Sequence, residues 1–131
     1  MTDLEVGLTF TETEVLIDED RVQGLHKILG IPAEYDSSTI PTYANLALSG
    51  VARQLADSGA VPSHGVVHTA EATKVVRPLV PGSVVDTSLR ITSVRERAGV
   101  LQFETTGTLA SEGDTIAVVT STLTYRTENK R

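Results

Sequence analysis

TIPTYANLALSGVARQLADSG, residues Thr39–Gly59, is the long helical pattern around which the rest of the chain can be arranged. Thr39 or Thr42 can cap its start, and Pro41 suits the first helical turn. Gly59 supplies a stop at the C-terminal end. Apolar side chains recur at helical spacing and share one face: Ala44, Leu48, Val51, Ala52 and Leu55.

The predicted helix is rich in small residues, with Ala, Ser or Gly at many positions between Ala44 and Ala56. A neighbouring backbone can therefore approach it closely from more than one side. This composition favours a helix enclosed by a curved sheet. An ordinary amphipathic helix on a flat sheet is the alternative that the pattern leaves open.

Four strand-like stretches follow the helix, and tight turns separate them. The alternation of apolar residues places Val85, Thr87, Leu89 and Ile91 on one face of the second stretch, and Leu101, Phe103, Thr105 and Leu109 on one face of the third. Turns are predicted at Pro81-Gly82 (type II), Arg97–Gly99 and Ser111–Asp114. The first, second and last stretches are Val66–Leu79, Val84–Arg95 and Thr115–Arg126.

The N-terminal part predicts a short strand and a first helix. Val6–Phe10 alternates as a strand does, and a helix capped by Asp18 extends to Gly30. The order is thus strand, helix, helix and then four strands. Helices and strands in separate blocks indicate an α+β domain with an antiparallel sheet, and 131 residues correspond to a single domain.

Composition excludes several classes of function. The net charge of −6, the aromatic content of 4% and the absence of Trp argue against a nucleic-acid partner. The chain has no Cys, which excludes thiol nucleophiles and thiolate zinc sites and is compatible with a reducing cytoplasm. We see no signal peptide, membrane-spanning run, phosphate-binding loop or metal-ligand spacing in the sequence.

One segment of the strand region carries a family resemblance. His68–Val85, HTAEATKVVRPLVPGSVV, together with IPTYANLAL at 40–48, resembles the MaoC-like dehydratase and hydratase family, which has the hotdog fold. It is most similar to the FAS1-like dehydratase branch, which includes non-catalytic subunits of two-subunit (3R)-hydroxyacyl dehydratases. The resemblance implies a curved antiparallel sheet wrapped around one long central helix.

The resemblance also implies a substrate and partners. The substrate would be a thioester of CoA or of acyl carrier protein, held in a tunnel at the interface of a homodimer or of a heterodimer with a catalytic hotdog subunit. No cofactor is implied. Backbone N–H groups near Thr42 and Tyr43, at the start of the long helix, would polarise the thioester carbonyl, because a helix N-terminus offers free donors. Arg77 is a candidate for binding a CoA phosphate or an acidic carrier protein, and a surface role with a local salt bridge is the competing interpretation.

The sequence departs from this family where catalysis is expected. Active hydratases carry an Asp and a His five residues apart before the long helix, for general acid–base chemistry. Here the region Gly30–Ile40 contains Asp36 but no His, and Pro41 lies five residues further on. We therefore expect that the chain alone is not a competent hydratase.

Three residues are candidates for catalysis: Asp36, His64 and His68. A turn-forming role is the competing interpretation of Asp36, and a core or interface role is that of His68. His64 is followed by Gly65 as in some hotdog thioesterases, but there the His-Gly pair precedes the long helix, whereas here it follows it. His68 is expected to share a strand face with Ala70 and Ala72. Two other functions stay open: an acyl-CoA thioesterase using His64, His68 or Glu71, and a non-enzymatic acyl-thioester-binding module.

Overall fold

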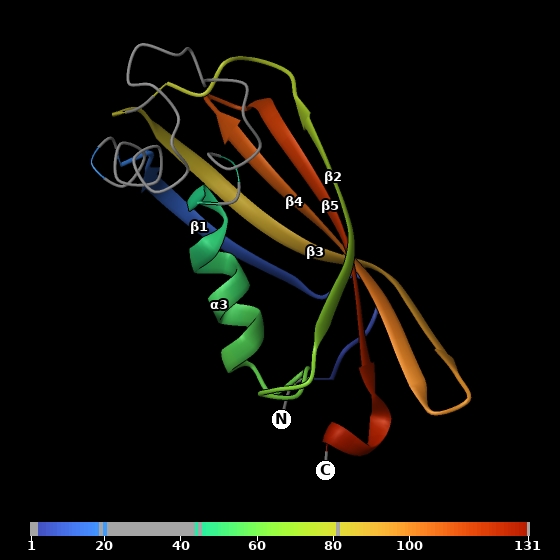
Figure 1. Cartoon of the computed structure of the whole chain (residues 1–131). Helices are drawn as coiled ribbons and strands as arrows, with labels where there is room; N and C mark the ends of the chain where they lie inside the picture. Colours follow the sequence, from blue (N-terminus) through green and yellow to red (C-terminus); the bar gives the residue numbers. More distant parts are fainter. Residues whose placement is uncertain (1–2, 19, 21–43, 45, 81, 131) are drawn as a thin grey trace.

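The computed structural model describes residues 3–18, 20, 44, 46–80 and 82–130, in which five antiparallel strands curve around a helix (Figure 1). Chain order gives β1 (Thr9–Leu16), α3 (Ser49–Asp57), β2 (Val67–Val75), β3 (Val84–Arg97), β4 (Val100–Ser111), β5 (Asp114–Arg126) and the short 3-10 helix η1 (Thr127–Lys130). The predicted α+β fold, a curved antiparallel sheet around one helix, is confirmed for this part of the chain.

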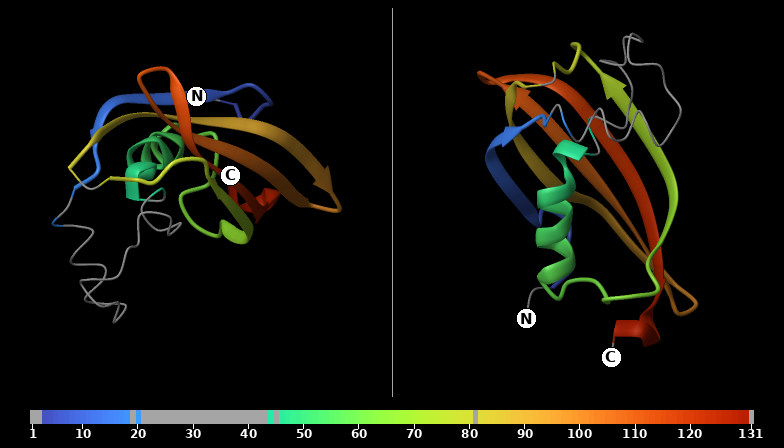
Figure 2. Two further views of the ribbon diagram at one scale, coloured as in Figure 1. Left: turned by 90° about the horizontal axis from the view of Figure 1, so that it is seen from above. Right: turned by 60° about the vertical axis from the view of Figure 1, so that its left-hand side comes forward.

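The sheet has the strand order β1-β3-β4-β5-β2. Two-residue turns join β3 to β4 and β4 to β5, at Ala98-Gly99 and Glu112-Gly113. All four turn residues have positive φ, the conformation that matches the right-handed twist of paired strands. Figure 2 shows α3 inside the bend of the sheet, with β1 and β2 at its two edges.

The core lies between α3 and the concave face of the sheet. Alternation along β3 and β4 directs every second side chain inward, as predicted, although Leu101 is only partly buried. Phe103, Ile91 and Leu109 are among the most deeply buried side chains. From the helical region, Ala44, Leu48, Val51 and Leu55 are buried against them, as the pattern predicted.

Ala52 is the exception on the helical stripe, because it is exposed rather than buried. It faces an open space between helix and sheet instead of a packed side chain. At the end of the helix the expected stop is confirmed: Gly59 has φ +84, a conformation that glycine adopts without steric cost. The turn at Gly82, with φ +89 and a Ser83 N–H donating to Val80 C=O at 3.0 Å, has the predicted type II features.

Two of the predicted strands differ most from the structure. The first strand is Thr9–Leu16 rather than Val6–Phe10, because a bulge between Glu12 and Val15 breaks the two-residue period that the sequence was expected to keep. The stretch Val66–Leu79 is a strand only over Val67–Val75. Beyond it Val76 and Arg77 both donate to Ile116 C=O, so regular pairing has ended before Pro78.

Several predictions concern residues outside those that the structure describes. They are most of the first helix from Asp18 to Gly30, the loop with Asp36, and the start of the long helix with Thr42 and Tyr43.

Candidate functional site

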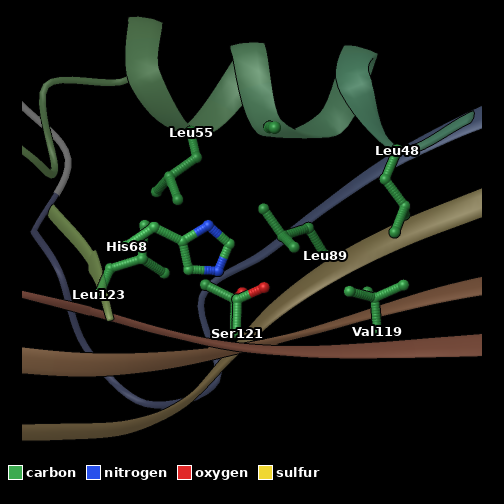
Figure 3. Close-up of a pocket in the computed structure, with 10 residues that line it drawn as sticks. Leu48, Leu55, His68, Leu89, Val119, Ser121 and Leu123 are labelled. Carbon is green, nitrogen blue, oxygen red and sulfur yellow. The ribbon is translucent and has the colours of Figure 1, made fainter. Parts of the chain in front are cut away.

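An apolar pocket of about 220 Å³ lies between α3 and the concave face of the sheet (Figure 3). Ala52 and Leu55 of α3, together with the N-cap residue Leu48, form one side of its wall. The sheet contributes residues from four strands: Leu89 from β3, Thr105 and Gly107 from β4, Val119, Ser121 and Leu123 from β5, and His68 from β2. Mostly aliphatic walls with a few polar groups are typical of a small-molecule site.

Small residues determine how closely the helix and the sheet approach each other around the pocket. Gly107 lets Leu48 approach the sheet closely, since a Cβ atom at this glycine would lie 2.7 Å from Leu48 Cδ1. Ala52, one helical turn beyond Leu48, leaves the adjacent space unfilled. The small-residue content of the helix therefore has two effects here: close packing at one end of the pocket and open volume in its middle.

His68 reaches the pocket because of a β-bulge in β2. His68 pairs with Leu123, but the next pairs along the strand are Ala70 with Thr122 and Glu71 with Ser121. Directly paired residues share a face, so His68 and Glu71 both lie on the concave side with Leu123 and Ser121, while Ala70 lies on the outer side. The expectation that His68 faces the same way as Ala70 and Ala72 is therefore wrong.

The same bulge brings His68 and Glu71 together. His68 Nε2 lies 3.8 Å from Glu71 Oε2, and the two side chains are 46% and 31% exposed. A carboxylate beside an imidazole can orient the ring. This is an arrangement that can take a proton from water at the pocket edge.

His64 lines an adjoining cavity of about 300 Å³, beyond the end of α3. This cavity shares Ala52, Leu55 and Leu123 with the first pocket. Its His64 Nδ1 lies 3.2 Å from Ser63 Oγ. The two histidines singled out from the sequence thus line neighbouring parts of one apolar region, although they belong to different chain segments.

Arg77 lies outside both cavities. Its guanidinium donates to Oδ2 of Asp114, the first residue of β5, at 2.7 Å. The pair is exposed, which fits the local ion pair that the sequence offered as the competing interpretation.

The remaining sequence candidates, Asp36, Thr42 and Tyr43, lie outside the described residues. Among the residues that are described, no group of three or more His, Asp or Glu side chains could hold a metal ion. No helix in the same part of the chain is long and apolar enough to span a membrane.

Sequence reasoning missed the pocket roles of Ser121 and Thr105 and the inward position of Glu71. Ser121 alternates with Val119 and Leu123 along β5, so a periodicity of two could have placed it on the inner face. Glu71 could not have been placed this way, because the bulge that turns it inward leaves no mark in the hydrophobic pattern.

No known family's sequence pattern matches this chain, and no curated protein matches it. Solved structures do. HtdX of Mycobacterium tuberculosis superposes with a TM-score of 0.77 at 18% identity, over 92% of this chain and 52% of HtdX. This chain thus spans about half the length of that structure.

Two further structures match over most of both chains. The fluoroacetyl-CoA thioesterase FlK has a TM-score of 0.69 at 17% identity, covering 97% of this chain and 92% of FlK. The HadBC (3R)-hydroxyacyl-ACP dehydratase complex of M. tuberculosis has a TM-score of 0.67 at 14% identity, covering 94% and 99%. The chain therefore has the hotdog fold, which these dehydratase and thioesterase structures share.

Proposed function

We propose that this chain binds an acyl thioester, with the acyl group in the pocket between α3 and the sheet. The observation that carries the proposal is the pocket itself: aliphatic side chains from helix and sheet form its walls, and polar groups are few. An alkyl chain gains free energy from leaving water for such surroundings. The thioester chemistry comes from the resemblance and from neighbours of the same fold named as acting on thioesters.

We further propose that the chain is a MaoC-like homologue of (3R)-3-hydroxyacyl-thioester dehydratases and enoyl hydratases, and serves as a subunit without an Asp/His pair of its own. The absence of a His between Gly30 and Pro41 supports this. HadBC, which has the same fold, is a complex of two different chains by its name. A catalytic hotdog partner would supply the acid–base pair, and N–H groups near Thr42 and Tyr43 would polarise the carbonyl.

Binding is tested by thermal stabilisation with a panel of acyl-CoAs. Ala52→Phe should abolish the stabilisation, because Ala52 is exposed and lines the pocket, so a large side chain can fill the space without entering the core. Arg53→Phe is the matched control: its exposed position lies next along α3 and does not line the pocket. Equal stabilisation of both variants would remove the pocket from the proposal.

The subunit role is tested by co-expression with a hotdog chain that carries the Asp/His pair. The expected result is a stable heteromer that hydrates an enoyl-CoA, followed as loss of the enoyl-thioester absorbance, while this chain alone does not. Purification of homodimers only, in the presence of every such partner of the source genome, would contradict it.

A second candidate, thioester hydrolysis, is favoured by His68, which lines the pocket, and by Glu71, whose Oε2 lies 3.8 Å from His68 Nε2. His68 would accept a proton from water as the water oxygen bonds to the carbonyl carbon. The carbon–sulfur bond then breaks and the proton passes to the thiolate. Glu71 would orient the imidazole.

Release of free CoA distinguishes the two reactions, since hydration of a double bond liberates no thiol. Hydrolysis predicts thiol release that His68→Gln abolishes and Glu71→Gln lowers, with His64→Gln as the comparison in the adjoining cavity. Binding without either reaction would instead favour the non-enzymatic acyl-binding module.

A further inference from the structure

Two buried threonines lie on the concave face of the sheet, and within the part of the chain that the structure describes only the hydroxyl of Thr87 has a hydrogen-bond partner. Thr87 and Thr105 are 3% and 4% exposed. Thr87 Oγ1 donates to Glu12 C=O at 3.2 Å. Thr105 lines the pocket, and its hydroxyl makes no hydrogen bond to any of the described residues.

A buried hydroxyl without a partner costs free energy, because it has left water and gained nothing in exchange. Buried polar groups in native proteins are nearly always hydrogen-bonded, and exceptions call for an explanation. Valine would fill the space of Thr105 without this cost. The hydroxyl at Thr105 therefore points to a partner that occupies the pocket.

Ser121 stands beside Thr105. The two residues are directly paired across β4 and β5, so their side chains emerge on the same face about 4.5–5.5 Å apart at Cβ. Ser121 also lines the pocket, where Figure 3 shows it between His68 and Val119, and its side chain makes no hydrogen bond to the described residues.

Thr105 and Ser121 are polar residues that lie between apolar neighbours on β4 and β5. On one side of it lie the paired Phe103 and Leu123, and on the other the paired Gly107 and Val119. Two adjacent hydroxyls, each able to donate and accept, can hold a single oxygen at that place. A plain alkyl chain lying across them would leave both hydroxyls unpartnered.

We propose that Thr105 and Ser121 form a hydrogen-bonding subsite that selects an acyl chain bearing a hydroxyl or oxo oxygen over a plain alkyl chain. This inference rests on the proposed binding of acyl thioesters. It assigns the two side chains a role in substrate specificity and no role in the reaction itself.

Calorimetric titration with hexanoyl-CoA and with hexanoyl-CoA carrying a hydroxyl at carbon 3, 4 or 5, or an oxo group at the same carbons, tests the proposal. At one of these positions the wild-type protein should bind the oxygenated ligand about 3- to 10-fold more tightly, as one or two neutral hydrogen bonds allow. Thr105→Val and Ser121→Ala should each reduce that preference toward unity while keeping the affinity for hexanoyl-CoA.

Thr87→Val is the matched control, since it removes a buried hydroxyl of the same kind outside the pocket. It should keep the ligand preference and lower the melting temperature of the unliganded protein. Thr105→Val should leave that temperature unchanged or raise it. An equal melting-temperature loss in both variants would mean that Thr105 is satisfied without a ligand and would overturn the inference.

Failure of this inference differs from failure of the proposed function. Equal wild-type affinity for plain and oxygenated ligands would overturn the subsite and leave acyl-thioester binding intact. Absence of binding by every ligand of the panel would overturn both.

Discussion

Single residues decide which groups meet at the pocket. Thr69 is the extra residue of the β2 bulge, and it turns His68 and Glu71 to the same side of the sheet. In a regular strand, residues three apart would face opposite sides. One inserted residue therefore decides whether His68 and Glu71 lie on opposite faces of β2 or close together on the concave face, where His68 lines the pocket.

The burial of Tyr125 leads to a prediction about protein stability at alkaline pH. Burial, and to a smaller degree the charge of Glu96, raises the pKa of the phenol above its ordinary value of 10.0. The folded protein thus holds this proton more tightly than the unfolded chain, so stability present below pH 10 is lost as pH rises through the folded pKa. Tyr125→Phe should lessen that loss, measured by urea unfolding at a series of pH values above neutrality.

The control is the measurement near neutral pH, where the unfolding free energies of wild type and Tyr125→Phe should change with pH in parallel. The phenylalanine can keep the edge-to-face contact with Phe103, whose ring centroid lies 6.1 Å away. A decline above pH 10 that is identical in both proteins would assign the pH dependence to other groups.

Substitution of Arg77 tests whether this residue, besides its exposed ion pair with Asp114, also contacts a ligand. Surface pairs contribute at most about 1 kcal/mol, so Arg77→Ala should change the unfolding free energy little. If Arg77 binds a CoA phosphate, the variant should bind acyl-CoA about 10-fold more weakly and acyl-pantetheine with unchanged affinity. Asp114→Asn, which breaks the ion pair but keeps the cation, should bind both normally; equal weakening for both ligands would contradict the phosphate role.

At the scale of elements, the contact between helix and sheet depends on where side chains are missing. Leu48 enters the space above Gly107, and Gly50 leaves room for the Glu12 side chain from β1. Larger residues at either place would separate the helix from the sheet or move these side chains. The curvature of the sheet and the small residues of the helix are therefore two parts of one packing arrangement.

Gly107→Ala is predicted to destabilise the fold by about 1–3 kcal/mol, because its Cβ would overlap Leu48 Cδ1 in a packed region. Urea denaturation measures the change. Thr106→Ala, the neighbouring residue on the outer face of β4, serves as the control and should cost less. Equal losses in the two variants would show that Leu48 relaxes freely and that the close approach has little energetic weight.

At the scale of the whole molecule, the edge strands of the sheet are the places where another chain can pair. β2 is an edge strand with most of its residues exposed on both faces. Val67 at its start and Val76 just after its end are 57% and 54% exposed. Open strand edges promote pairing with another chain. We expect two copies, or one copy and a related partner, to pair through β2 and so place His68 and Glu71 near the interface.

Light scattering should accordingly give twice the 14.0 kDa mass of the chain. Replacing Ala70 and Ala72 on β2 by lysine should favour the monomer, since like charges would meet across the two-fold axis. Their direct partners on the interior strand β5, Thr122 and Thr120, provide the control: lysines there should leave the dimer intact. A wild-type monomer at all concentrations would exclude this assembly.

The sequence by itself determined the α+β class, the inward face of β3 and the hairpin turns, because local periodicity and glycine positions encode them directly. It also indicated a helix small enough in side-chain volume to lie inside a bent sheet. These features depend on residues close together in the chain, for which pattern and conformation are tightly linked.

Only the tertiary structure decided the composition of the pocket. Thr105, Ser121 and His68 meet because β4, β5 and β2 are neighbours in the sheet, an order that differs from their order in the chain. The bulge at Thr69 further reverses the face of Glu71 with no change in local hydrophobicity. Strand order and register are set by long-range packing, and a single-residue shift in register exchanges the two faces of a strand.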